Sequence, residues 1–325
     1  MADSKQNRIL ITGANGFIGG ALMRHYETNG MSPIGIDLVG VGENTLAEDI
    51  SKPETFSAAL DKCDVLIHAA ALVSNAASDP DMWKANVLAT KRLAEAAVKY
   101  RVKRFIHISS IVVYGNTAEG ELDETHPVHG NGGSYVLTKL AAEHAVLASA
   151  MKSSMETVII RPGDVYGPGS RPWVVLPIEA IKKSQFILPG YGRGYFRPIY
   201  IDDLVTGISL AASKESAANE IFNMSCKGYI STKEFFSYHF KWIDKRGPFS
   251  VPTPIALLCA SAATKIAKLS GEVNEASRAT MMQLCTKSWF NISKAEHLLG
   301  WRPEMSLDEG MNLSRGWALQ NGLLD

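Results

Sequence analysis

Short apolar runs alternate with longer segments of helical period through the first half of the chain. The runs are five to seven residues long and rich in aliphatic side chains. Runs of this kind are typical of parallel strands that are buried on both faces. The alternation predicts an α/β fold with a doubly wound parallel (Rossmann) sheet, which binds ligands at the carboxyl ends of its strands. The expected strands are RILIT (8–12), PIGID (33–37), DVLIHAA (64–70), RFIHISS (104–110) and TVIIRP (157–162).

The pattern changes near residue 161. Before it, one helical segment opens at Asp79, the expected N-cap, with Pro80 in the first helical position, and runs to about residue 100. After it, Pro and Gly become denser and the periodicity is mixed, apart from one return to the sheet. We therefore expect a Rossmann domain and a smaller mixed α/β substrate-binding region toward the C-terminus. The expected division is 1–160 with about 199–226 for the former, and 161–198 with 227–325 for the latter.

A glycine-rich loop joins the first strand to the first helix in LITGANGFIGGAL (10–22). Gly13 permits a tight turn, Gly16 lets the backbone approach a pyrophosphate, and Gly19 allows the helix to pack close to the strand. Asp37 ends the second strand, 18 residues after Gly19, where its carboxylate can accept a hydrogen bond from a ribose 2′-hydroxyl and repels a 2′-phosphate. The pattern therefore predicts NAD rather than NADP. The loop residues assigned to the same site are Asn15, Phe17 and Ile18.

Tyr135 and Lys139 are four residues apart in SYVLTKLAAEHAV (134–146), a spacing that puts them on one face of a helix. A free tyrosine titrates near pH 10. A lysine ammonium and a positive nicotinamide ring beside it would lower that pKa, so that the phenol could exchange a proton with a substrate hydroxyl. A YxxxK spacing alone fits an ordinary solvated helix face better than a catalytic site, so its meaning depends on its partners.

Those partners occur in the order expected of one family. The chain resembles the extended short-chain dehydrogenase/reductases, the NAD-dependent epimerase/dehydratase group. The resemblance runs nearly end to end and includes IYIDDL (199–204) and SKAEHLLGWRPEMSLDEG (293–310). The earlier motifs that carry it are TGANGFIG (12–19), HAA (68–70), Asn86, SSIVVYG (109–115), YxxxK (135–139) and RPGDVYGPG (161–169).

The resemblance implies a Ser-Tyr-Lys catalytic site. In this family the catalytic hydroxyl residue lies five residues before the glycine of VYG, which is Ser110 here, 25 residues before Tyr135. If the strand stays regular, Ser109 faces the other way and is expected to serve packing. The expected catalytic set is therefore Ser110, Tyr135 and Lys139.

The resemblance also implies NAD contacts beyond the glycine loop. Asn86 takes a structural role on the helix after the HAA strand. Two helices, at 80–100 and 134–150, are expected to form a homodimer interface. The further residues that the resemblance assigns to NAD are Asp49 and Ile50 near the adenine, Ala69 and Ala70 after the HAA strand, Pro162 and Val165 near the nicotinamide, and the catalytic Tyr135 and Lys139.

The family's shared chemistry is hydride transfer at a carbinol carbon, and one departure from its patterns narrows the reaction. Sugar-nucleotide 4,6-dehydratases carry an Asp-Glu pair directly after the catalytic hydroxyl residue. Ile111 and Val112 occupy those places here. An aliphatic pair cannot move protons, so the sequence argues against water elimination.

Other departures argue against a sugar-nucleotide epimerase without excluding it. Asp164 replaces the usual Asn of RxxNVYGP, which adds negative charge where a diphosphate would approach. Phe196 begins the segment that is RDF in epimerases. Residues 281–291 lack the usual arginine, and Asn291 replaces an Asp. The arginines that could supply the missing charge from nearby positions are Arg193, Arg197 and Arg278.

The same segments resemble bacterial 3β-hydroxysteroid dehydrogenase-like proteins. We therefore expect an NAD-dependent dehydrogenase or ketoreductase that acts on a secondary alcohol of a bulky, hydrophobic substrate. The alternatives are a UDP-hexose 4-epimerase or 4-keto reductase, and an NAD-binding protein without activity. The expected substrate-binding residues are Ser110, Asp164, Trp173, Phe196 and Arg197.

VPTPIALLCASAATKIAKLSG (251–271) predicts a helix with one apolar stripe, which would cap the substrate domain, line an apolar pocket or rest on a membrane. The stripe consists of Ile255, Leu258, Cys259, Ala262, Ile266 and Leu269.

Composition adds mainly exclusions. Lys and Arg equal Asp and Glu at 33 each, so no nucleic-acid footprint is expected. No apolar run suffices for a transmembrane segment, and the N-terminus lacks a signal-peptide pattern, so we expect a cytoplasmic protein. The four cysteines and eight histidines show no metal-ligand spacing, so no metal site is expected. His68 and His107 lie inside strands and are expected to be structural or pocket-lining.

Overall fold

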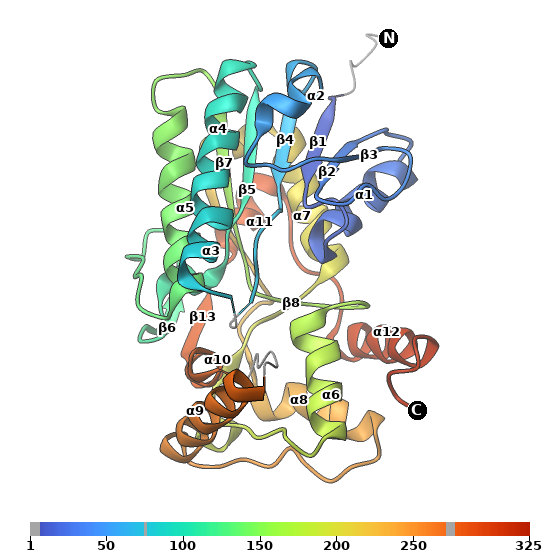
Figure 1. Ribbon diagram of the computed structural model, residues 1–325, viewed down its shortest axis with the longest axis vertical. Coiled ribbons are helices and arrows are strands. Elements are labelled where there is room, and N and C mark those ends of the chain that lie inside the picture. Colours follow the sequence, from blue (N-terminus) through green and yellow to red (C-terminus); the bar gives the residue numbers. More distant parts are fainter. Residues whose placement is uncertain (1–6, 75–76, 271–276) are drawn as a thin grey trace.

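A seven-stranded parallel sheet forms the centre of the upper part of the molecule as drawn in Figure 1. The structure is a computed structural model, and it describes residues 7–74, 77–270 and 277–325. The strand order is β11-β7-β5-β4-β1-β2-β3, and every neighbouring pair is parallel. The order reverses between β1 and β4, which is where doubly wound sheets bind ligands. The strands are β1 (Ile9–Thr12), β2 (Ile34–Asp37), β3 (Thr45–Ala47), β4 (Val65–His68), β5 (Arg104–Ile108), β7 (Glu156–Pro162) and β11 (Ile221–Met224).

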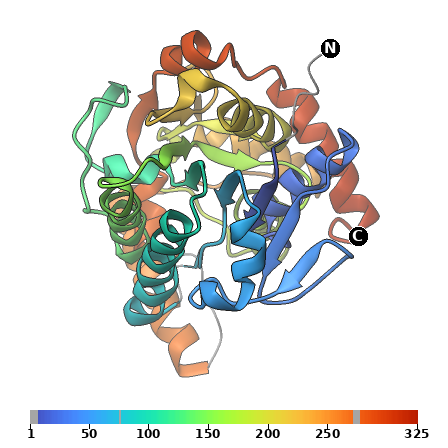
Figure 2. The ribbon, with the colours of Figure 1, turned by 90° about the horizontal axis from the view of Figure 1, so that it is seen from above.

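Helices cover both faces of this sheet, as Figure 2 shows from above. Successive strand residues point to opposite faces, so Ile9 and Ile11 of β1 join one core and Leu10 the other. The first core is closed by α1 (Phe17–Thr28), α7 (Ile201–Ser213) and α11 (Ser293–Leu299), and the second by α2 (Ser57–Asp61), α4 (Ala89–Lys99) and α5 (Ser134–Ala150). The predicted Rossmann fold is confirmed.

Two local predictions are wrong in detail. The strand expected to include Ser110 ends at Ile108, and residues 111–114 form a 3-10 turn because Ser110 caps the amide of Val112. The helix at Asp79 is capped by Ser78, whose hydroxyl accepts from the Asp81 amide, so Pro80 is in the second position. That helix continues through α3 (Asp79–Trp83), a π-helical turn (Lys84–Leu88) and α4.

The C-terminal lobe packs around an aromatic cluster. Phe196 stacks on Phe235 with ring centroids 3.9 Å apart, and Trp173 meets Phe196 edge-on at 4.9 Å. Three two-stranded sheets lie within the lobe or at its border: β8 (Asp164–Tyr166) with β10 (Pro198–Tyr200), β9 (Tyr195–Phe196) with β12 (Ile230–Ser231), and β6 (Glu119–Leu122) with β13 (Lys287–Phe290). Its helices are α6 (Leu176–Lys182), α8 (Thr232–Trp242), α9 (Thr253–Ser270), α10 (Arg278–Gln283) and α12 (Leu307–Gln320).

The apolar stripe of α9 faces outward. The helix buries its alanine side instead, where Ala256 and Ala260 pack with Met281. The expectation that this stripe is the side of the helix that caps the lobe or lines a pocket is therefore wrong. The small alanine side chains let α9 approach α10 more closely than the larger stripe residues would. The exposed stripe residues are Ile255, Leu258, Cys259, Ala262 and Ile266, while the side chain of Leu269 lies outside the described part of the chain.

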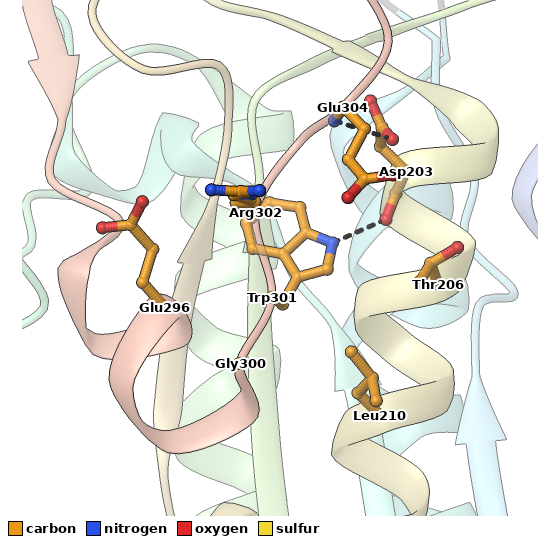
Figure 3. Close-up of a pocket in the computed structure, with 8 residues that line it drawn as sticks. All are labelled: Asp203, Thr206, Leu210, Glu296, Gly300, Trp301, Arg302 and Glu304. Atoms are coloured by element: carbon orange, nitrogen blue, oxygen red, sulfur yellow. Dashed lines mark hydrogen bonds between the residues drawn. The ribbon is translucent and has the colours of Figure 1, made fainter.

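A surface hollow marks where the IYIDDL segment meets the C-terminal segment (Figure 3). The Asp203 carboxylate accepts from the amides of Glu304 (3.1 Å) and Met305 (3.0 Å), and its backbone carbonyl accepts from the Trp301 indole (2.8 Å). These bonds hold Trp301 buried against α7. The hollow lies on α7 and α11, across the sheet from α5, so these motifs serve the fold.

Candidate active site

Two positions of the glycine loop, Gly13 and Gly19, have no room for a side chain. Gly13 has φ +71°, and its amide donates to the Ile36 carbonyl at 2.8 Å. A Cβ on Gly13 would lie 2.7 Å from the Ala70 nitrogen, and one on Gly19 would lie 1.9 Å from the Gly13 oxygen. Gly16 is the N-cap of α1 and offers no side-chain cap, so the first helical amides are available to an anion. This cradle fits a dinucleotide pyrophosphate.

Two carboxylates border the same end of the sheet. Asp37, at the end of β2, accepts from the amides of Asn15 (2.9 Å) and Leu38 (2.8 Å), which ties the loop to the strand. Asp49 accepts from the Ser51 amide at 2.8 Å, and this hydrogen bond lowers the pKa of the Asp49 carboxyl. The remaining residues predicted to contact NAD lie in the glycine loop or near the strand ends. Pro162 is buried. The half-buried ones are Phe17, Ile18, Ile50, Ala69, Ala70 and Val165.

Tyr135 and Lys139 project from the first two turns of α5. The Lys139 ammonium donates to the Ile108 carbonyl at 2.9 Å and lies 5.9 Å from the centroid of the Tyr135 ring. Burial lowers the pKa of Lys139 to about 8, although the nearby Glu143 carboxylate opposes the shift. Burial raises the pKa of Tyr135. The predicted lowering of this pKa would therefore require the positive charge of a bound nicotinamide in addition to Lys139, whose ammonium already donates to a carbonyl.

The two adjacent serines have different surroundings. Ser110 is half-buried just beyond β5, with its hydroxyl accepting from the Val112 amide at 3.3 Å. Ser109 is 3% exposed, and its hydroxyl donates to the Glu143 carboxylate. Only Ser110 is therefore accessible beside α5, while Ser109 belongs to a buried polar network.

That network was not found from the sequence. Arg161 on β7 makes a two-pronged ion pair with Glu143, with nitrogen–oxygen distances of 2.7 and 3.0 Å. Its third nitrogen donates to the Tyr114 hydroxyl (2.9 Å), which donates to Asn223 of β11 (2.8 Å). Glu143 lies one helical turn after Lys139, so the i, i+4 spacing on α5 was the available signal.

A second set of buried polar residues braces the other side of α5. Asn86 accepts from the Leu72 amide (2.7 Å) and donates to the Leu72 carbonyl (3.0 Å) and the Thr138 hydroxyl (3.3 Å). His68 lies between Thr12 and Thr90 at 2.7 and 2.8 Å. Burial lowers the pKa of His68 to about 3 and that of His107 well below its usual value, so both rings are neutral.

Asp164 and Arg197 neutralise one another where β8 meets β10. The Asp164 carboxylate accepts from the Arg197 amide at 3.0 Å and lies 3.3 Å from its guanidinium, which also donates to Thr286 (2.6 Å). Both side chains are 4% exposed. Burial raises the pKa of Asp164, and Arg197 opposes that shift. The expected excess negative charge is therefore absent, because a buried carboxylate needs its counter-ion.

The aromatic residues predicted to contact substrate lie deeper than expected. Phe196 is 1% exposed within the aromatic cluster, so the expectation that it meets a ligand is wrong: its ring is stacked on Phe235. Trp173 is half-buried, and its carbonyl accepts from His239 at 2.8 Å. Of the two, only Trp173 retains accessible surface.

Comparison with known proteins agrees with this architecture. The model of the NAD dependent epimerase/dehydratase family matches residues 9–225, which is about two thirds of the chain. The chain belongs to this family. It is therefore an NAD-dependent dehydrogenase or epimerase of the extended short-chain dehydrogenase/reductase group, and the predictions of family and cofactor are confirmed.

Its relatives within the family include dehydrogenases, reductases and epimerases. A sterol-4-alpha-carboxylate 3-dehydrogenase (decarboxylating) of Candida albicans is 29% identical over 98% of this chain and 99% of the relative. A UDP-glucose 4-epimerase of Vibrio cholerae is 30% identical over 93% of this chain and 92% of the relative. The structure of MoeE5 in complex with UDP-glucose and NAD superposes with a TM-score of 0.78 at 25% identity, covering 97% and 99% of the two chains.

Two further observations bear on partners. None of the helices within the described residues combines the length and the hydropathy that a membrane span requires. Within the same residues, no group of three His, Cys, Asp or Glu side chains is placed to hold a metal ion.

Proposed function

We propose that the protein is an NAD-dependent dehydrogenase or ketoreductase that interconverts a secondary alcohol and a ketone on a bulky, hydrophobic substrate. The observation that carries this proposal is the closed Asp164–Arg197 pair. The Arg197 side chain is 4% exposed, with its guanidinium 3.3 Å from Asp164 and its Nη1 donating to Thr286 and the Tyr195 carbonyl, so burial keeps it from a diphosphate. A neutral wall suits a neutral, apolar substrate.

The catalytic roles follow from the placement of three side chains. Ser110, accessible beside α5, would hold the substrate oxygen, and Tyr135 would exchange the hydroxyl proton. Lys139, anchored on the Ile108 carbonyl, would place its positive charge near the phenol. NAD, when bound, supplies the hydride acceptor or donor. Its pyrophosphate would lie on the amides at the start of α1, and its adenine ribose near Asp37.

The alternative is a UDP-hexose 4-epimerase or 4-keto reductase. The Vibrio cholerae epimerase favours it, since it is as similar to this chain as the sterol dehydrogenase. Arg193 and Arg278 are exposed and could bind a diphosphate. Ile111 and Val112 still argue against elimination chemistry, because Ile111 is 3% exposed and neither side chain can transfer a proton.

Ligand binding distinguishes the two candidates. Calorimetric titration in the presence of NAD would compare UDP, UDP-glucose and a 3β-hydroxysterol. We expect a response to the sterol and none to UDP. Tight UDP binding would overturn the proposal and favour the epimerase, because the nucleotide would then supply much of the substrate affinity.

Activity of the Tyr135→Phe variant tests the mechanism, and with it the third candidate, a protein that binds NAD without catalysis. The variant should lose turnover by roughly 10²- to 10⁴-fold, because it lacks the transferable proton. Its NAD affinity, measured by fluorescence titration, should stay within about twofold. Undiminished turnover would contradict the assigned role, and absence of activity in the unmodified protein toward both the 3β-hydroxysterol and UDP-glucose would favour the silent protein.

We also infer a homodimer. Helices α4 and α5 pack side by side, and large apolar side chains are exposed on α5 and at the adjoining ends of the pair. They are Leu137 and Leu147 on α5, Met151 directly after α5, and Leu88 at the end of the π-helical turn that leads into α4. Such a face is typical of a subunit interface. Light scattering should give twice the chain mass, and Leu137→Glu should halve it. A cytoplasmic location remains a prediction from the sequence.

A further inference from the structure

The most exposed apolar surface of the C-terminal lobe is one face of α9. Leu258 is 71% exposed, Ile266 66% and Ile255 49%. Cys259 and Ala262 fill the positions between them on the same helical face. Phe249, four residues before the helix begins, is 63% exposed. A continuous apolar stripe of this size on an 18-residue helix is unusual for a surface in contact only with water.

The opposite side of α9 explains why the stripe points outward. Ala256 and Ala260 are buried with Met281 of α10, while Ile187 and Val251 pack beside them. These small contacts fix the rotation of the helix. The exposed face is therefore a consequence of how α9 is anchored.

Cations outnumber acids in two segments that pack beside α9. The segments 182–193 and 241–265 carry seven Lys or Arg residues and one acid, Asp244, in a protein whose formal net charge is zero. The two segments lie against each other, since the Leu188 amide donates to the Phe249 carbonyl at 2.9 Å. Figure 1 places both at the same end of the molecule as α9. The exposed cations here include Lys183, Arg193, Arg246 and Lys265.

We propose that α9 and the loop bearing Phe249 bind the surface of an anionic lipid bilayer, with α9 lying in the plane of the interface. Leu258, Ile266, Ile255 and Phe249 enter the boundary between headgroups and acyl chains, and the surrounding cations meet lipid phosphates. An apolar stripe bordered by net positive charge is complementary to such a surface, whereas a second copy of this face would bring like charges together.

The membrane face also adjoins the candidate active site. Helix α10 packs on α9, and its Gln283 side chain lies 3.5 Å from the Asp164 carboxylate. Ala279 of the same helix lies 3.6 Å from the position of a Cβ on Gly133, two residues before Tyr135. A lipophilic substrate dissolved in the bilayer would thus have a short route to Tyr135. The binding itself does not depend on the proposed reaction.

Vesicle co-sedimentation of the full-length protein tests the proposal. Vesicles of phosphatidylglycerol and phosphatidylcholine should retain it, and pure phosphatidylcholine should retain it far less. Leu258→Ser combined with Ile266→Ser should lower the partition coefficient on the order of tenfold or more. Leu313→Ser on α12, where the leucine is 49% exposed, is the matched control and should leave it unchanged.

A charge-reversal variant and a measurement of oligomer mass separate the remaining outcomes. Lys265→Glu should weaken binding to anionic vesicles by roughly fivefold or more and binding to neutral vesicles little. Equal loss in the Leu313→Ser control, or no vesicle binding by the unmodified protein, would overturn the proposal. So would a fall in oligomer mass with Leu258→Ser, which would identify a second copy as the occupant. Tyr135→Phe should bind vesicles normally, so failure of the proposed catalysis and failure of membrane binding are distinguishable.

Discussion

The NAD-binding half of the molecule and the C-terminal lobe are held in shape by different kinds of contact. Around the cofactor cradle, backbone meets backbone: Gly19 approaches the Gly13 carbonyl so closely that a single methyl group would overlap it. In the lobe, side chains meet side chains, as in the stack of Phe196 on Phe235 and the Asp164–Arg197 pair. Backbone contacts depend on a short local motif, whereas side-chain contacts depend on residues far apart in the chain. This difference explains how one family keeps its cofactor while its substrates vary.

The largest expected effect concerns the buried Glu143–Arg161 pair, which joins α5 to β7 of the central sheet. Glu143→Gln leaves Arg161 buried with an uncompensated charge, which should lower the free energy of unfolding by about 3–5 kcal/mol. Urea denaturation would measure it. Glu95→Gln, which breaks the exposed Lys91–Glu95 pair, is the matched control and should cost under about 1 kcal/mol. Similar losses in both variants would show that the network adds no stability.

The pH dependence of stability should report on Lys139. Its pKa of about 8 in the folded protein lies below the ordinary value of 10.5, so between these pH values the unfolded chain binds more protons than the folded one. Stability contributed at this site therefore rises with pH from about 8 to 10.5, by up to about 3 kcal/mol. Unfolding free energies of the unmodified protein and Lys139→Met should converge or cross over this window. A constant difference would contradict a buried, destabilised ammonium.

A methyl group added to the glycine loop should weaken NAD binding more than it lowers the stability of the fold. Gly19→Ala places a Cβ 1.9 Å from the Gly13 oxygen and should lower NAD affinity by roughly a hundredfold, because the loop must shift to relieve the overlap. Gly20→Ala, one residue on, meets its nearest atoms at 3.4 Å and should bind NAD almost normally. Isothermal titration of both variants measures the contrast, and equal affinities would break the comparison drawn above.

The smallest effect is expected in the aromatic cluster. Phe196→Leu roughly conserves volume and should cost about 1–1.5 kcal/mol of unfolding free energy. Because Phe196 is 1% exposed, KM for substrate and affinity for NAD should both stay within about twofold. A large change in KM, with NAD affinity unchanged, would show that Phe196 contacts the substrate.

Local patterns allowed much of the cofactor half to be predicted. Five of the sheet strands could be predicted because parallel strands buried on both faces leave uninterrupted apolar runs. The short edge strand β3 was missed, since TLA (45–47) carries no such run. Ser110 was located by its distance from Gly115, although the turn that positions it was not foreseen.

By itself, then, the sequence determined the Rossmann sheet, the glycine cradle, the acid at Asp37 and the Tyr135–Lys139 face, because each depends on neighbours within a few turns or strands. Only the tertiary structure decided that Arg197 neutralises Asp164, that Glu143 holds Ser109 and Arg161, and that the apolar stripe of α9 faces outward. Burial and counter-charge at those positions come from residues distant in the chain. A periodic pattern shows which side of a helix is apolar, but only the packing of its neighbours decides which side is buried.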